Sequence, residues 1–144
     1  MDRLHLLATI AGERVAFDAT GVDSVVEIDH IVPVPRAPAH IAGIAPLRSR
    51  VLTVIDCDTA LGRGSVSRGA IVPAIVVTVE GHLYGLLVDS VDDVVAVAGE
   101  PIPVRARLAA GWAKIAREAI EHEGALLLRV DPAALVAGTA ALAA

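Results

Sequence analysis

One seven-residue pattern occurs twice in this chain of 144 residues, and it constrains the fold more than any other feature. Val22–Ile28 has the sequence VDSVVEI, and Val91–Val97 has the sequence VDDVVAV; four of the seven positions are identical. A slightly longer offset along the chain places Ile55-Asp56 on Val130-Asp131. Internal similarity of this kind indicates two units with the same plan. Chance similarity between valine-rich segments is the alternative.

The segments between these patterns predict strands. Hydrophobic residues make up 55% of the chain, and many of them are valine or isoleucine. Such β-branched side chains favour strands because they pack well on a pleated surface. Gly12 and Gly81 have the same offset as the two valine patterns, and each lies in a predicted hairpin turn. Each half then has the same order: hairpin, valine pattern, proline stretch, strand and Asp-capped turn. The sequence therefore predicts an all-β protein of two similar small units with a shared core.

The length is that of one domain. We expect a single domain over residues 1–144, with repeat halves at about 12–66 and 70–137 and a tail at 138–144. Gly62–Gly69 (GRGSVSRG) is the predicted connector between the halves. The N-terminal residues make a poor signal peptide, and Ile71–Val79 and Pro132–Ala144 are too short for a membrane helix. These features predict a cytoplasmic protein without membrane insertion.

One segment is ambiguous. Leu108–Glu123 is rich in Ala, Lys, Arg and Glu, which favours a helix. The repeat instead aligns Gly124 with Ser49, which makes Arg117–His122 the first arm of a hairpin into Ala125–Val130. We predict a helix that ends near Lys114, followed by a strand.

The sequence contains no arrangement typical of an enzyme. Cys57 stands between Asp56 and Asp58, whose charges oppose thiolate formation, so we interpret it as a structural residue. Glu121-His122-Glu123 has metal-binding side chains, but this short polar segment is typical of a strand edge or a turn. No phosphate-binding loop and no GxSxG motif occur. We predict no catalytic residue, no metal site and no cofactor.

The composition also bears on the partner class. A net charge of −5, with only three aromatic residues, argues against a nucleic-acid binder. A protein-docking role is favoured. Two other classes stay open: a small-ligand-binding β-barrel or related regulatory module of a two-component system, and an enzyme that uses Asp56, Cys57 or His122. The shortage of aromatic residues counts against the ligand-binding barrel.

Two motifs resemble the CheW-type chemotaxis coupling proteins. The first is Pro33–Pro38 (PVPRAP) followed by Ile41–Asp56 (IAGIAPLRSRVLTVID), and the second is Tyr84–Val94 (YGLLVDSVDDV). The resemblance covers about residues 4 to 137. The chain departs from the family pattern at three positions, where the family usually has Asn, Gly and Pro: Pro46, Ser49 and Thr53.

The resemblance implies a non-enzymatic adaptor made of two SH3-like five-stranded β-barrels around a shared core, with short helices. Such proteins couple the cytoplasmic tips of chemoreceptors to the regulatory domain of a CheA-type histidine kinase. The implied receptor-binding groove consists of Val22, Val25, Glu27, Ile28, Val88, Val91 and Val94. The implied kinase-binding or interface-orienting residues are Gly43, Arg48, Arg50 and Val51. We further predict an ion pair between Glu27 and Arg48 beside the groove.

Overall fold

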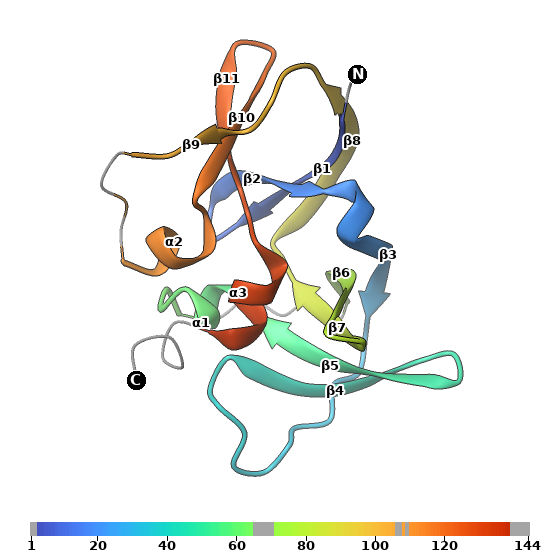
Figure 1. Ribbon diagram of the computed structural model, residues 1–144. Coiled ribbons are helices and arrows are strands. Elements are labelled where there is room, and N and C mark those ends of the chain that lie inside the picture. Colours follow the sequence, from blue (N-terminus) through green and yellow to red (C-terminus); the bar gives the residue numbers. More distant parts are fainter. Residues whose placement is uncertain (1–2, 65–70, 106–107, 109, 139–144) are drawn as a thin grey trace.

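The computed structural model describes residues 3–64, 71–105, 108 and 110–138, which form two β-sheets with short helices (Figure 1). The first sheet has the order β8-β1-β2-β11-β10-β9 and the second the order β3-β6-β7-β5-β4. The strands of the first sheet are β1 (Arg3–Ile10), β2 (Glu13–Asp18), β8 (Ser90–Val97), β9 (Ile102–Pro103), β10 (Glu118–His122) and β11 (Ala125–Arg129). Those of the second are β3 (Val22–Ile28), β4 (Ile41–Leu47), β5 (Arg50–Asp56), β6 (Val72–Val79) and β7 (His82–Leu87). The helices are the 3₁₀-helix η1 (Ala19–Gly21), α1 (Cys57–Ala60), α2 (Ala110–Ile115) and α3 (Pro132–Ala137).

The two sheets have the same plan. Hairpin β6–β7 has the bounds of hairpin β1–β2 displaced by the offset of the valine patterns, and β8 occupies the place in the first sheet that β3 has in the second. Even an irregularity recurs: the pairing of β3 with β6 shifts between Val22 and Ser24, and that of β8 with β1 shifts between Val91 and Asp93. The two copies of the valine pattern thus occupy equivalent positions.

Each sheet nevertheless takes strands from both parts of the chain. Hairpin β1–β2 lies with β8–β11, and hairpin β6–β7 lies with β3–β5. The exchanged hairpins are joined to their sheets by two parallel pairs, β2 with β11 and β7 with β5. Neither sheet is therefore complete without strands from both parts of the chain. The repeat boundaries near residues 66 and 70 therefore stay a prediction about the sequence, and they do not separate the sheets.

A short pairing closes each sheet into a barrel. Val32, beyond β3, exchanges backbone hydrogen bonds of 2.8 and 2.9 Å with Ile44 of the opposite edge strand β4. In the first sheet the corresponding pairing is two residues long, and it forms the short strand β9, which pairs with β10. The predicted fold of two five-stranded units is confirmed, with β9 as the sixth strand. We call the first sheet barrel A and the second barrel B.

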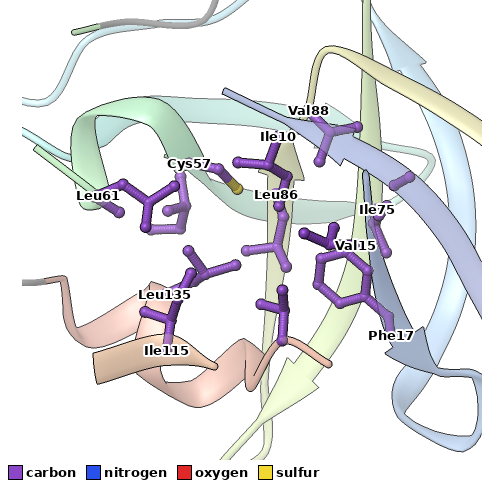
Figure 2. Close-up of a cluster of buried hydrophobic side chains, with 14 of the residues drawn as sticks. Ile10, Val15, Phe17, Cys57, Leu61, Ile75, Leu86, Val88, Ile115 and Leu135 are labelled. Atoms are coloured by element: carbon purple, nitrogen blue, oxygen red, sulfur yellow. The ribbon is translucent and has the colours of Figure 1, made fainter. Parts of the chain in front are cut away.

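Alternation along the strands divides the buried side chains into three cores. The shared core lies between the barrels and includes Ile10, Phe17, Ile75 and Leu86 together with residues of α1, α2 and α3 (Figure 2). Within barrel B lies a core of nine buried residues: Ile28, Ala45, Leu52, Val54, Val72, Ala74, Val76, Leu83 and Leu87. Barrel A has a core of five: Leu7, Ala16, Val97, Ile120 and Leu127.

Local signals place the helices. Asp56 accepts a hydrogen bond of 3.0 Å from the Thr59 amide and begins α1, and Asp131 accepts one of 3.1 Å from Ala133 and begins α3. The ambiguous segment forms helix α2 up to Ile115 and then strand β10, as predicted. Most of the predicted connector, residues 65–69, lies outside the described residues. None of the described helices is long and apolar enough to span a membrane.

Candidate functional site

Strands β3 and β8 expose branched aliphatic side chains at equivalent positions. Val25 is 45% exposed and Val94 is 52% exposed. Because successive side chains of a strand point to opposite faces, their neighbours Val26 and Val95 turn inward and pack against the barrel cores. Exposed valines at matching places on both barrels favour a surface that contacts another protein.

A groove of about 680 Å³ opens between β3 and β8, beside the first residues of β6. Its lining is Val25, Val26, Glu27, Ile71, Pro73, Asp89, Ser90 and Val91. The groove thus combines aliphatic side chains with two carboxylates. Of the predicted groove residues, the structure brings together Val25, Glu27 and Val91 here. Val94 is exposed on β8 beyond the lining, and the half-buried Val22 packs against the shared core.

The prediction of two groove residues was wrong, because both are buried in the cores. Ile28 is 7% exposed and belongs to the core of barrel B, while Val88 is fully buried in the shared core. Ile28 lies three residues after Val25, so the two side chains point to opposite faces of β3. A partner reaches neither Ile28 nor Val88 without opening a core, and we exclude both from the candidate site.

The predicted ion pair between Glu27 and Arg48 is wrong. Arg48 lies in the β4–β5 turn and lines a second hollow, of about 400 Å³, whose lining from β3 is Asp23, Ser24, Val25 and Val26. Glu27 lines the other groove and not this hollow, although Val25 and Val26 of β3 line both. Among the described residues, neither Glu27 nor Arg48 has an ion-pair partner.

The predicted kinase-binding residues divide into a structural and an exposed group. Gly43 is buried, with a φ of 148°, and a Cβ there would overlap the carbonyl oxygen of Val32. Arg50 and Val51 are exposed at the beginning of β5, Val51 at 63%. Val51 pairs with Pro46 of β4, on the same face as the exposed Ile44, and Ile44 pairs in turn with the exposed Val32 of the preceding loop. We call this set the β4 patch: Val32, Val34, Ile44 and Val51.

The sequence analysis missed a polar cluster inside barrel A. Arg129 of β11 donates hydrogen bonds to Asp18 (2.5 Å), to Glu118 (2.8 Å) and to Nε2 of His5 (3.2 Å). The repeat offsets hold a signal that could have found it. They align His5, Asp18 and Arg129 with Ala74, Leu87 and Val54, all in the core of barrel B.

The environment of this cluster changes its titration. Burial lowers the pKa of His5, and the charge of Arg129 lowers it further, against a contribution from the Arg3 carbonyl that raises it. Burial alone would raise the pKa of Asp18. Hydrogen bonds from Thr20 and the charge of Arg129 outweigh burial, so the pKa of Asp18 lies below its ordinary value. The cluster therefore favours a neutral His5 beside an ionised Asp18.

Cys57 has the surroundings of a core residue. The side chain is fully buried in the shared core. Burial raises the pKa of the thiol well above its ordinary value, and the negative charges of Asp56, Asp58 and Asp89 raise it further. A thiol held neutral and away from solvent is a poor nucleophile.

Comparison with known proteins gives one family. The family model described as the CheW-like domain matches residues 5–140. A chemotaxis protein CheW of Rhizobium meliloti (strain 1021) is 31% identical over 100 residues, which cover 69% of this chain and 64% of that protein. The chemotaxis protein CheW of Treponema pallidum (strain Nichols) is 28% identical over 109 residues, 70% of this chain and 62% of that protein. The match thus spans less than two thirds of the length of either relative.

A solved structure has the same fold. The crystal structure of the scaffolding protein TtCheW from Thermoanaerobacter tengcongensis superposes with a TM-score of 0.81, covering 91% of this chain and 90% of that one. The two sequences are 23% identical. The two-barrel architecture is therefore shared at low sequence identity.

Proposed function

Because the chain belongs to the family of CheW-like domains, we propose that it is a non-enzymatic adaptor of chemotaxis signalling. In this role it joins the cytoplasmic tips of chemoreceptors to the regulatory domain of a CheA-type histidine kinase, and it reaches the receptor arrays from the cytoplasm through these partners. The observation that carries the proposal is the aliphatic groove between β3 and β8. The buried, neutral thiol of Cys57 supports a role without catalysis.

The groove is the proposed receptor site. Its exposed aliphatic residues, Val25 and Ile71, can receive the apolar stripe of a helical hairpin. Glu27 and Asp89 stand in the same lining and suit polar or basic side chains beside that stripe. Val94 extends the aliphatic surface along β8. Arg48 lies in the β4–β5 turn and lines the second hollow beside β3, from which we propose that it orients the partner.

The β4 patch is the proposed kinase site. Val51 and Ile44 lie on adjacent strands and are exposed, and Arg50 adds a cation at the edge. A central aliphatic cluster with a charged rim is the usual anatomy of a protein interface. Gly43 acts there indirectly, because its lack of a side chain lets the Val32 backbone close the barrel.

Two matched substitutions test both sites. Val25→Asp places a charge in the groove, and Val51→Asp places one in the β4 patch. We expect Val25→Asp to weaken binding to a receptor-tip hairpin by about tenfold or more, with kinase binding unchanged, and Val51→Asp to do the reverse. Affinities are measured by biolayer interferometry on folded variants, with Leu126→Asp, at an exposed residue of β11 outside both proposed sites, as the control. If neither partner binds the parent protein, or if both variants bind like the parent, the proposal is wrong.

A further inference from the structure

The polar cluster of barrel A is unlike anything at the corresponding place in barrel B. There, Ala74, Leu87 and Val54 fill the interior with apolar side chains. In barrel A, a cationic Arg129 is 18% exposed and holds three partners from three other strands. Among the described residues, barrel A has five buried apolar residues in its own core against nine in barrel B, and the polar cluster occupies part of its interior.

The hydrogen bonds fix which nitrogen of His5 carries the proton. Nε of Arg129 only donates, so Nε2 of His5 must accept with its lone pair. The hydrogen of the neutral ring then sits on Nδ1, which faces the carbonyl oxygen of Arg3 at 3.4 Å. His40, the other buried histidine in the described part of the chain, has the opposite arrangement. Its Nε2 donates to the Val136 carbonyl at 2.8 Å, a bond that survives protonation of the ring.

The charges around His5 do not favour a second cation. On its own strand, β1, the nearest charged residue is Arg3, and β11 contributes Arg129. On β2, Asp18 faces the ring, but this carboxylate is already bonded to Arg129 and Thr20; on β10, Glu118 is likewise bonded to Arg129. The residue opposite His5 on β8 is the uncharged Val95. Protonation would leave Nε2 of His5 and Nε of Arg129 as two donors pointing at each other.

His5 is connected to the candidate groove through β8, about 13 Å (four residues) along the strand from the groove residue Val91. Its backbone pairs with Val95 of β8, the neighbour of the exposed Val94, and β8 begins with the groove residues Ser90 and Val91. A change in the packing of β1 against β8 therefore reaches the groove along β8, whose first residues form one wall.

We propose that His5 makes barrel A a proton-sensitive element: protonation at Nε2 removes the acceptor of Arg129, loosens barrel A and moves the β8 wall of the groove, while barrel B is unaffected. Mild acid then lowers the affinity of the protein for the partner that binds in the groove. This last step rests on the proposed function, whereas the loosening of barrel A does not.

Hydrogen exchange at pH 7.5 and 5.5 tests the loosening, with barrel B as the reference in the same molecule. After correction for intrinsic exchange, we expect the protection of amides in β1, β10 and β11, relative to β6 and β7, to fall by up to about tenfold, since pH 5.5 is one unit below the ordinary histidine pKa. His5→Gln keeps an acceptor oxygen without titrating, so it should abolish the difference. His82→Gln, at an exposed histidine of barrel B, should behave like the parent.

Equal loss of protection in both barrels, or a difference that persists in His5→Gln, would overturn the proposal. If His5→Gln does not fold, measurements on the parent protein alone test the proposal. In the parent, barrel A protection must begin to fall as pH drops through the ordinary histidine pKa, and the folded His5 ring, followed by NMR, must titrate at lower pH than that. A ring that titrates at the ordinary pKa, or constant barrel A protection over this range, refutes the inference.

A binding measurement separates this inference from the proposed function. We expect the affinity for a receptor-tip hairpin to fall several-fold from pH 7.5 to pH 5.5 in the parent and not in His5→Gln. Absence of binding at pH 7.5 contradicts the proposed function and leaves the exchange result to decide on His5. Binding at pH 7.5 that does not weaken in acid contradicts the link between His5 and the groove.

Discussion

At the scale of single residues, a substitution of Cys57 tests whether its thiol has a structural or a reactive role. The thiol is buried in the shared core with a raised pKa, so its contribution is packing. Cys57→Ala should lower the free energy of unfolding by about 1–2 kcal/mol and leave partner affinities within about twofold. Chemical denaturation and binding assays measure the two effects. Loss of binding by a folded Cys57→Ala protein would assign the residue a role that its position does not explain.

Two buried or half-buried aspartates predict opposite effects of pH. The pKa of Asp18 is lowered, because its hydrogen bonds from Thr20 and the charge of Arg129 outweigh burial; its stabilisation is complete above the ordinary pKa and is lost as pH falls. The pKa of Asp58 is raised, first by burial and then by Asp89 and Asp56, so its ionisation lowers stability as pH rises through the raised pKa.

Asparagine at these two positions gives a matched experiment. Asp18→Asn should destabilise the protein at pH 7 and reduce its loss of stability in acid. Asp58→Asn keeps an oxygen for the Ala11 amide and removes the cost of a buried charge, so it should be neutral or stabilising at pH 7. Thermal unfolding between pH 3 and pH 8 measures both. Parallel curves for the two variants would contradict the assignment of opposite shifts.

At the scale of elements, closure of barrel B depends on the close approach of two backbones. Gly43 stands where a Cβ would overlap the Val32 carbonyl, and the Val32–Ile44 pairing closes the barrel. Gly43→Ala should cost about 2–4 kcal/mol of stability. The control is Gly81→Ala in the β6–β7 turn, where φ is +81° but no atom lies within 4 Å; it should cost about 1–2 kcal/mol. Equal losses would mean that the approach to Val32 is not what requires glycine.

Elements that rest on local signals were predictable from the sequence, and those that rest on distant contacts were not. Gly12 and Gly81 mark hairpins, and Asp56 and Asp131 mark helix starts, because turns and caps depend on neighbouring residues. The repeat supported β10 at a segment whose propensity favours a helix. The Arg129 cluster joins residues up to 124 positions apart, so only the comparison of the two repeats held any trace of it.

The candidate site was predictable in part. Val25 and Val91 line the groove, as expected from the resemblance and from strand alternation. The prediction that Ile28 lines the groove was wrong, because Ile28 lies three residues after Val25 and its side chain therefore points to the opposite face of the strand. The predicted ion pair of Glu27 with Arg48 does not form: closure of barrel B places the β4–β5 turn at a hollow lined by Asp23–Val26 of β3, and Glu27 lines the neighbouring groove. Sequence alone does not determine that closure.

At the scale of the whole molecule, the exchanged hairpins predict that neither part of the chain folds without the other. A chain split into 1–64 and 65–144 leaves each fragment without the partner strands of its hairpin. We expect each fragment alone to lack the circular dichroism of the folded protein, and the mixture to recover it. Fluorescence of Trp112, which packs in the shared core, reports the same recovery. A fragment that folds alone with cooperative thermal unfolding would contradict the dependence of both sheets on both parts.

The exchange of hairpins also sets the order of events during synthesis on a ribosome. Strand β1 is made first, yet its outer edge pairs with β8, and β2 pairs with Leu128 and Arg129 of β11 near the end of the chain. At translation rates of about 5–20 residues per second, the first hairpin waits roughly 6–22 s for the last of these partners. During that time two apolar strand edges stay open to other chains. The nascent protein is therefore most exposed to misassembly before its final strand emerges.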